Sequence, residues 1–271
     1  MTRLKLTTLK TLTILAILPL AGHAYSQNDI SLDMSRGWTR RDWFACEDVS
    51  KMSSDRHRMT IATDKSASLY WQVPTMKGPL PIDPNLDWVL ECDRPPRGFA
   101  QEIADGPKTR TLIDLSDYRY FTWKWKVTNT IDDRQTIDDS GRIQKEGDDF
   151  AAKLGITILK KGSNDPRELS YVWMRSLPEE KVIVHERRIL FWRFQYHRIV
   201  AQSGDADVGK WVSEARDLYA DYKRIYPNEE PGKIVKIYVM SDSDNTGSSV
   251  AGTFADLAFR KGRPTSISRS E

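Results

Sequence analysis

Strict alternation of apolar and polar residues is the feature that most constrains how this chain folds. The segment "YFTWKWKV" carries it most clearly, because every second residue is apolar: Phe121, Trp123, Trp125 and Val127. The same period of two recurs in "KLGITIL", "ILFWRFQYHRIV", "KIVKIYVMSD" and "FADLAF", and more weakly in "RMTIAT", "SLYWQV", "RTLIDL" and "LSYVWMR". Alternation of this kind indicates strands with one buried face and one more solvent-exposed face. At least nine strands joined by turns predict a mainly β chain, with antiparallel sheets packed as a sandwich.

The alternation also predicts which side chains face the core. Trp123 and Trp125 share a face with other apolar residues, so they are expected inside. The other residues expected on buried faces are Leu154, Ile156 and Ile158, then Leu190, Trp192, Phe194 and Tyr196, then Val235, Ile237 and Val239, and finally Ala255, Leu257 and Phe259.

One segment, "WVSEARDLYADYKRIYP", has apolar residues at helical spacing and ends at Pro227. It predicts a single helix packed on a sheet. Two readings of its start remain open. The helix begins near Val212, or Asp217 is the N-cap and "KWVSEAR" before it is a strand.

The chain begins with "MTRLKLTTLKTLTILAILPLAGHAYSQ". In this segment Arg3, Lys5 and Lys10 precede an apolar run, which is followed by small residues suited to a cleavage site. This order is typical of a secretory signal peptide, cleaved after Ala24 or else after Ser26. The run is too short to span a bilayer, and no later stretch is apolar enough to do so. We therefore expect residues 1–24 to be a signal peptide, 25–262 one β-sandwich domain and 263–271 a flexible tail. The expected location is the periplasm of a Gram-negative-type envelope.

Export changes the meaning of the charge. The chain has 41 Lys and Arg and 38 Asp and Glu, and three of the basic residues lie in the signal peptide. The mature chain is therefore neutral. A neutral chain has no global basic field to attract nucleic acid, so nucleic-acid partners are not expected.

The two cysteines, Cys46 and Cys92, remain after cleavage. In an oxidising compartment an even count favours a disulfide between them, although two separate buried thiols are the alternative. No C-x-x-C pair is present, so neither a zinc site nor thioredoxin-like chemistry is expected.

Several segments in order resemble one bacterial family, the DUF3047 proteins, whose function is unknown: "YFTWKWKV", "GDDFAAKLGITI", "LSYVW", "SGDADVGKWVSEARDLYADYKRIYP" and "VMSDSDNTGSSVAGTFADLAF". They span roughly residues 111–259. The chain departs from the family pattern at Lys153, where arginine is usual. The resemblance implies an exported β-sandwich of jelly-roll (galactose-binding-like) type, and it implies no reaction.

The turn after "KIYVM" carries Asp242, Asp244 and Asn245, followed by Gly247. Side-chain oxygens at alternate positions before a glycine suit a calcium-binding loop. An EF-hand loop that began at Asp242 would need an acidic residue at its twelfth position, and that residue is Thr253. Three alternatives remain: a tight turn in which Gly247 has positive φ, a ligand-binding surface, or a calcium site of another type at Asp242 and Asp244. No cofactor other than calcium is expected.

A second acidic pair, Asp148 and Asp149, begins a predicted strand. Neighbouring residues on a strand point to opposite faces, so only one carboxylate can turn inward, with Arg216 as its expected partner. Either carboxylate could also pair with Asp242 or Asp244 in a glycosidase, which needs two carboxyl groups about 5–9.5 Å apart.

Nine tryptophans offer aromatic rings on which a sugar could stack. Trp173 is the best candidate for such a stacking surface, because its face of the predicted strand carries both apolar and polar residues. The histidines His57, His185 and His197 lack metal-site spacing, and no nucleophile elbow, P-loop or dinucleotide fingerprint is present.

The leading hypothesis is a protein that binds a carbohydrate or related cell-envelope polymer. The alternatives are a polysaccharide hydrolase or lyase and a structural envelope protein. The expected ligand surface is Asp148, Asp149, Trp173, Arg216, Asp242, Asp244 and Asn245.

Overall fold

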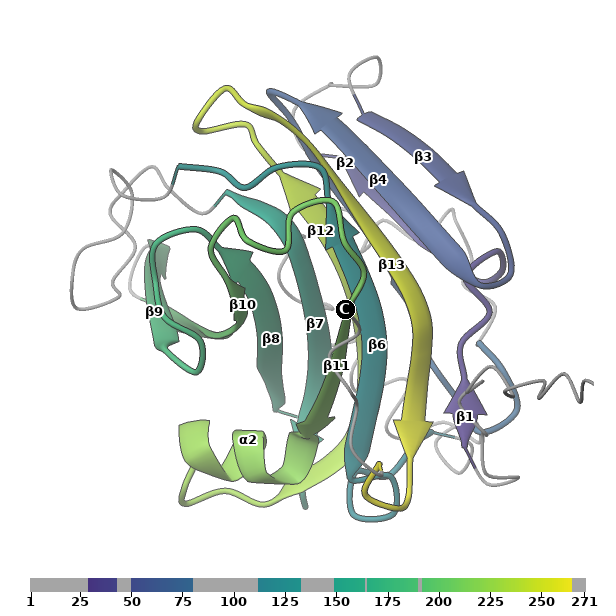
Figure 1. The fold of residues 1–271 in the computed structure, drawn as a ribbon. Coiled ribbons are helices and arrows are strands. Elements are labelled where there is room, and N and C mark those ends of the chain that lie inside the picture. Colours follow the sequence, from purple (N-terminus) through teal and green to yellow (C-terminus); the bar gives the residue numbers. More distant parts are fainter. Residues whose placement is uncertain are drawn as a thin grey trace, which may run out of the picture.

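The computed structural model describes residues 29–42, 50–79, 112–132, 149–163, 165–189 and 192–264. Across these ranges the chain forms two β-sheets that face each other, with one helix at the lower end of Figure 1. The expectation of a mainly β sandwich with one packed helix is confirmed.

The first sheet has the order β11-β6-β13-β4-β3, and β1 pairs with β13 beside this path. Its strands are β11 (Val212–Asp217), β6 (Tyr120–Val127), β13 (Ser249–Arg260), β4 (Arg58–Asp64), β3 (Ser50–Ser54) and β1 (Ile30–Ser31).

The second sheet has the order β2-β5-β12-β7-β8-β10-β9. Its strands are β2 (Thr39–Asp42), β5 (Ala67–Gln72), β12 (Pro231–Asp242), β7 (Phe150–Lys160), β8 (Pro166–Met174), β10 (Trp192–Ser203) and β9 (Val182–Ile189). The β8–β10 pair is parallel, because the chain crosses over from β8 to β9 before β10 returns between them.

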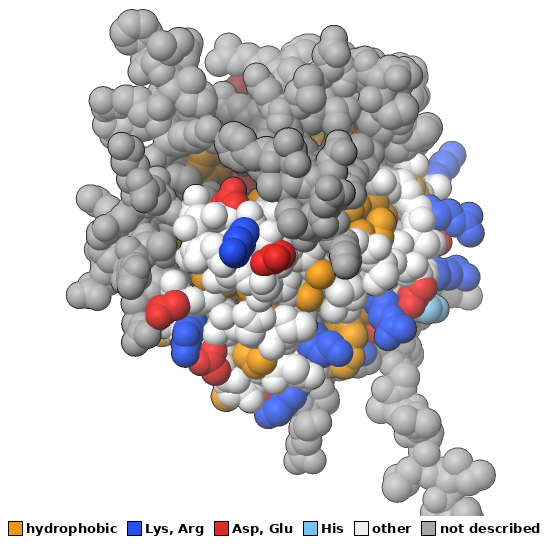
Figure 2. All heavy atoms as spheres, turned by 90° about the horizontal axis from the view of Figure 1, so that it is seen from above, with side chains coloured by type: hydrophobic (Ala, Val, Ile, Leu, Met, Phe, Trp, Pro, Cys, Tyr) orange, Lys and Arg blue, Asp and Glu red, His pale blue; other side chains and the backbone are white. Residues whose placement is uncertain are grey.

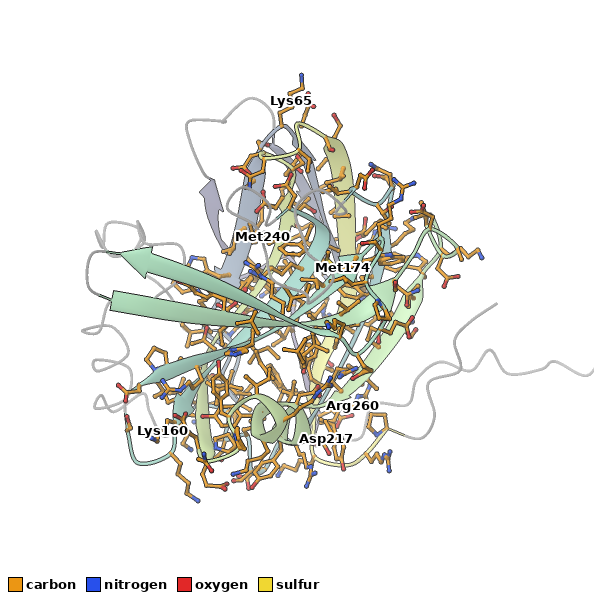
Figure 3. All side chains as sticks on the ribbon, turned by 90° about the vertical axis from the view of Figure 1, so that its left-hand side faces the viewer. Lys65, Lys160, Met174, Asp217, Met240 and Arg260 are labelled. Atoms are coloured by element: carbon orange, nitrogen blue, oxygen red, sulfur yellow. The ribbon has the colours of Figure 1, made fainter. Side chains whose placement is uncertain are left out.

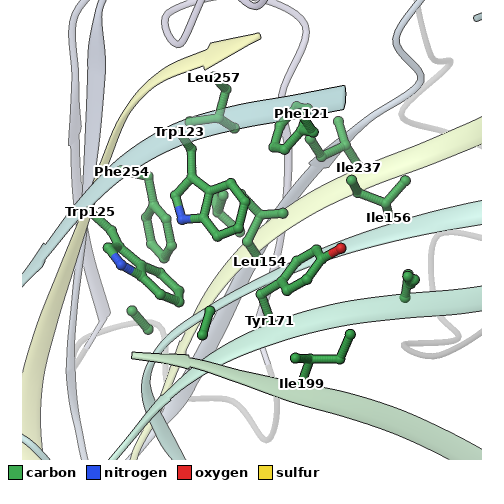
Figure 4. Close-up of a cluster of buried hydrophobic side chains, with 14 of the residues drawn as sticks. Phe121, Trp123, Trp125, Leu154, Ile156, Tyr171, Ile199, Ile237, Phe254 and Leu257 are labelled. Atoms are coloured by element: carbon green, nitrogen blue, oxygen red, sulfur yellow. The ribbon is translucent and has the colours of Figure 1, made fainter. Parts of the chain in front are cut away.

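The core between the sheets is aromatic. Trp123 and Trp125 are at most 1% exposed, as their alternation predicts, and they lie edge to face with centroids 5.5 Å apart. Tyr171 of the opposite sheet packs 5.1 Å from Trp123, and Phe254 belongs to the same cluster (Figure 4). Large rings from both sheets interdigitate here, and each buries a large apolar surface that helps to stabilise the sandwich.

The one helix in the described residues is α2 (Leu218–Ile225); its N-cap is Asp217, whose side chain accepts the backbone N–H of Ala220. The preceding residues form β11, so the second reading of this segment is confirmed. The N-cap fixes the boundary because it satisfies a backbone N–H group that the first turn of a helix leaves without an intrahelical partner.

Two residues expected inward, Val235 and Ala255, are buried as expected but lie outside the main core, and both differences occur at β-bulges. The register of β12 shifts between Ile234 and Lys236, so Ile234 enters the main core and Val235 joins a separate cluster. The register of β13 shifts after Ala255, which lies outside the main core although Leu257 and Phe259 lie in it. One extra residue reverses the faces of everything beyond it.

The weak strand expected at 110–115 is also not observed as a strand in its described part. Leu112 and Asp114 form isolated bridges, with Thr75 and with Lys233. The proposed signal peptide, Cys46, Cys92 and Asp148 lie outside the described residues, so cleavage, export and the disulfide stay predictions. No helix in the described part of the chain is long and apolar enough to cross a membrane.

Candidate functional site

Three carboxylates meet where β12 ends and β7 begins. Each of Asp149, Asp242 and Asp244 offers an oxygen within 4.8 Å of the others. Asp242 pairs with Phe150 in the register of β12 and β7, which explains how residues so far apart in sequence become neighbours. We call these three residues, together with Asn245, the acidic end. It lies at the top of Figure 1, where β12 turns into β13.

Asp149 organises the turn between β12 and β13. Its carboxylate accepts the backbone N–H groups of Asn245 and Thr246, at 3.2 and 2.7 Å, and also the hydroxyl of Thr246. Gly247 follows with φ +63°, the left-handed conformation that the turn interpretation predicts. Asp149 is 6% exposed, so these donors compensate the lost hydration of its carboxylate.

The hydroxyl groups of Ser241 and Ser243 form hydrogen bonds between this turn and the rest of the sandwich. The Ser243 hydroxyl forms hydrogen bonds with the hydroxyl of Thr63 in β4 and with the carbonyl of Ser66 in the β4–β5 connection. The Ser241 hydroxyl donates to the carbonyl of Ala151 and accepts the N–H of Gly252. Because four strands converge on these bonds, the acidic end is a rigid part of the structure rather than a loose loop.

Replacing Asp149 with alanine should therefore destabilise the protein by about 2–3 kcal/mol, since two backbone donors and one hydroxyl lose a charged acceptor. Asp149→Asn keeps an oxygen acceptor and should cost less. Urea unfolding of both variants measures the difference. Equal stability of Asp149→Ala and the unmodified protein would contradict this role.

The spacing of the three carboxylates also fits a cation. Two ligands of one calcium ion, each about 2.3–2.6 Å from it, lie at most about 5 Å apart. Without compensation, two unit charges at this separation repel by roughly 3 kcal/mol at an effective dielectric constant of about 20. Asp242 is 4% exposed, Asp244 is half-buried and Asn245 is exposed, so the cluster reaches the surface through the turn. Figure 2 looks onto this end, where charged side chains of both signs are scattered over a largely polar surface.

The structure does not bring Trp173 to the acidic end's surface. Its ring is 2% exposed and packs 5.8 Å from Trp125 in the core, and its indole N–H donates to the carbonyl of Gly204. A ring enclosed on both faces offers no platform to a sugar. Tyr171, two positions earlier on the same face of β8, is also buried.

Arg216 also lies elsewhere, at the α2 end of the sandwich, opposite the acidic end in Figure 1. Its guanidinium donates to Asp221 at 2.9 Å and to Glu180, and it lies 5.3 Å from the ring centre of Tyr171. Burial by itself would lower the pKa of Arg216, but the hydrogen bonds to both carboxylates raise it well above the usual range. The inward partner of Asp149 is therefore backbone N–H, and Arg216 instead ties β11 to α2.

The sequence interpretation missed a charged cluster on the face of the second sheet turned away from the core. Glu168 accepts the hydroxyl of Tyr238 at 2.7 Å, and Lys153 Nζ lies 3.9 Å from the same carboxylate oxygen. Burial raises the pKa of Glu168, but Lys153, Lys236, Tyr238 and Arg198 together bring it below its usual value. The available signal was a lysine inside each of two apolar runs, "AAKLGITI" and "KIVKIYVM".

Comparison with known proteins supports the resemblance seen in the sequence. A family model described as "Protein of unknown function (DUF3047)" matches residues 100–258, more than half of the chain. The chain belongs to the DUF3047 family. The matched region contains Asp149 and the whole β12–β13 turn, so this DUF3047 protein carries its acidic end inside the family's shared segment. Among curated proteins, none matches it significantly.

Several solved structures are similar in overall form. A family 11 carbohydrate-binding module of the cellulase Lic26A-Cel5E of Clostridium thermocellum is 9% identical, covers 88% of this chain and 97% of its own, and has a TM-score of 0.35. The endoglucanase cel12A from Rhodothermus marinus is 9% identical, covers 85% of this chain and 97% of its own, and has a TM-score of 0.38. The xyloglucanase domain of NopAA from Sinorhizobium fredii, in complex with cellobiose, is 9% identical, covers 88% of this chain and 98% of its own, and has a TM-score of 0.39. At these identities and TM-scores, none of these likenesses carries an argument about ligand or activity.

Proposed function

We propose that this DUF3047 protein is exported to the periplasm and binds a carbohydrate or a related polar cell-envelope polymer at its acidic end. The observation that carries the proposal is the approach of Asp149, Asp242 and Asp244 to within 4.8 Å of one another, beside the exposed Asn245. Carboxylate and amide oxygens accept hydrogen bonds from sugar hydroxyls, and the amide of Asn245 can also donate one.

The rigidity of this end supports a binding role. A ligand that meets preformed groups does not have to order them, so less binding free energy is lost. Asp149, Ser241 and Ser243 hold the turn through bonds to several strands, while Asp244 and Asn245 remain nearer the surface. This division separates groups that build the site from groups that would contact the ligand.

Thermal unfolding with a panel of soluble oligosaccharides tests the proposal. A glycan that binds only the folded state raises Tm by mass action, by an amount that grows with its concentration. Asp244→Asn should abolish at least most of the shift, because it replaces a charged acceptor at the surface. Asp117→Asn is the matched control, since Asp117 is exposed in the turn before β6 and should leave the shift unchanged. A panel that never moves Tm would reject the proposal.

Calcium is a second candidate ligand, favoured by the fit of the three carboxylates to one ion. Asp149, Asp242 and Asp244 would supply the protein oxygens, and the ion would cancel their repulsion. Adding calcium to chelator-treated protein should then raise Tm by several degrees, and magnesium should do less, because its smaller shell demands a tighter octahedron. Asp242→Asn should remove this response. Identical melting in calcium and in chelator would exclude the ion.

Hydrolysis of a glycosidic bond is less well supported by this geometry. Both oxygens of Asp149 accept hydrogen bonds from the turn, which leaves it poorly placed to act as a base or nucleophile. Release of reducing ends from a glycan that shifts Tm would nevertheless establish a hydrolase, and release of unsaturated ends a lyase. A purely structural envelope protein would show neither activity nor any shift.

A further inference from the structure

Two arginines from different elements converge on one glutamate at the α2 end of the sandwich. Arg216 of β11 donates hydrogen bonds to both carboxylate oxygens of Glu180, in the connection between β8 and β9. Arg224 of α2 donates to one of these oxygens at 2.9 Å and also to the Glu180 carbonyl. In Figure 3 this end is at the bottom, where the labelled Asp217 precedes the helix. We call Arg216 and Arg224 the arginine pair.

The exposure of these side chains separates a buried partner of Arg216 from an accessible one. The side chains of Arg216 and Asp221 are 13% and 10% exposed, so their ion pair is buried. The side chain of Glu180 is 55% exposed and that of Arg224 is 41% exposed. If the Glu180 carboxylate moved away, Asp221 would still neutralise Arg216. The buried ion pair therefore does not depend on Glu180.

The backbone of Glu180 has a conformation that disfavours a residue of its type. Its φ is +67°, and it is the third residue of a turn closed by a hydrogen bond from the Lys181 N–H to the Pro178 carbonyl. Glycine adopts this left-handed conformation without the steric cost that a Cβ brings. The turn by itself would thus favour glycine. What glutamate adds at this position is a carboxylate bonded to the arginine pair.

Two guanidinium groups that share one carboxylate form a site suited to an oxyanion. Their N–H groups form rigid forks, which match the paired oxygens of a carboxylate or a phosphate group. Hydrogen bonds from Arg216 hold the pKa of Glu180 below its usual value, so Glu180 is an anion at neutral pH. Among the described residues, Glu180 is the only acid bonded to Arg224. Without the Glu180 carboxylate, Arg224 would therefore need another anion.

We propose that the arginine pair binds an oxyanion of a ligand, either a carboxylate or a phosphate group, and that the Glu180 carboxylate occupies this site when the ligand is absent. When the ligand binds, its oxyanion takes the position of the Glu180 carboxylate, and the exposed Glu180 side chain turns into solvent. Because Glu180 is tethered beside the site, it competes at a high effective concentration. The arginine pair lies at the end of the sandwich opposite the acidic end, so this site is separate from the one proposed there.

NMR titration of the isotope-labelled protein with inorganic phosphate and with glucuronate tests this site. Both probes are added at constant ionic strength against chloride, because salt screens every surface charge. At least one probe should bind the unmodified protein, and it should bind Glu180→Ala about tenfold or more tightly, because the competing carboxylate is gone. Arg224→Gln should abolish binding. It leaves the buried pair of Arg216 and Asp221 in place, so this variant should fold.

Asp205→Ala is the matched control. It removes a carboxylate of similar exposure, 52% against 55%, that pairs with a single arginine, Arg175. This variant should bind both probes as the unmodified protein does. Circular dichroism and Tm of each variant show whether it is folded, and the titration of the unmodified protein relies on no variant.

The two probes also distinguish the possible ligands. Binding of phosphate alone assigns the site to a phosphorylated ligand, binding of glucuronate alone assigns it to a carboxylate, and binding of both assigns it to oxyanions in general. Three results would overturn the proposal. The first is that neither probe binds the unmodified protein, even if one binds Glu180→Ala, because Glu180 would then be a permanent structural partner. The others are binding that is no tighter in Glu180→Ala, and binding that persists in folded Arg224→Gln. The Arg224 variant places any response at the α2 end, so the outcome is independent of the glycan test of the acidic end.

Discussion

Replacing Arg216 with alanine should lower the free energy of unfolding by about 3–5 kcal/mol, the usual cost of removing one partner from a buried ion pair. Arg216 and Asp221 have side chains that are 13% and 10% exposed, and they join through a bond of 2.9 Å. The substitution would leave the Asp221 carboxylate buried next to the Tyr171 hydroxyl, with its cation gone. Tyr171 belongs to the second sheet, Arg216 to the first and Asp221 to α2, so all three elements would lose a shared contact.

Arg175→Ala is the matched control for this loss. Arg175 pairs with Asp205 at 3.1 Å, but both side chains are more than 40% exposed. An exposed pair contributes about 0–1 kcal/mol, so the control should unfold almost like the unmodified protein. Urea denaturation of both variants at one pH gives the comparison. If Arg216→Ala proved as mild as Arg175→Ala, the α2 end would not depend on this network.

Replacing Gly155 with alanine should destabilise the protein by about 2–3 kcal/mol or more, through overpacking of a strand. A Cβ at this position would lie 2.1 Å from two ring atoms of Tyr238 on the neighbouring strand β12. The ring cannot swing away cheaply, because its hydroxyl is held by Glu168 and two lysine Nζ atoms lie 5.1 and 5.2 Å from its centre. The glycine is thus required by the close approach of an aromatic ring.

Gly262→Ala is the control here, since a Cβ at Gly262 meets nothing within 4 Å. A double variant sharpens the test. In a Tyr238→Leu background the clash is relieved, so Gly155→Ala should cost clearly less than in the unmodified protein. Additive losses in the double variant would show that the glycine acts through its backbone and not through the Tyr238 ring.

The local parts of the fold were predictable because they depend on neighbouring residues. Period two in "YFTWKWKV" identified β6 and its buried tryptophans, and the capping chemistry of Asp217 offered the correct start of α2 as one of two readings. Val235 and Ala255 are buried outside the main core, and this difference arose where a bulge inserted one residue into the ladder. A bulge is selected by the partner strand and the packing around it, and a single-strand pattern carries no trace of either.

The candidate site was predictable only in part. The acidic turn and Asp149 were both recognised as candidates, but the pairing of Asp149 with Arg216 and a surface role for Trp173 depended on guessing which strands are neighbours. Asp149 bonds to residues 96 and 97 positions further along the chain, and Arg216 bonds to Glu180 and Asp221 at the other end of the sandwich. The buried charges around Glu168 were missed, because lysines on a strand are ordinarily solvent-facing.

By itself, the sequence identified strands with clear alternation such as β6, and it offered the Asp217 cap and the positive φ of Gly247 among its alternatives, since these depend on short-range sterics and on side chains that bond to nearby backbone. Tertiary structure decided that Asp149 lies beside Asp242 and Asp244, and that Trp173 is enclosed. It also decided that Arg216 donates hydrogen bonds to Asp221 of α2. Those outcomes follow from strand order and register, which are set by the packing of the whole sandwich and by hydrogen bonds between distant segments.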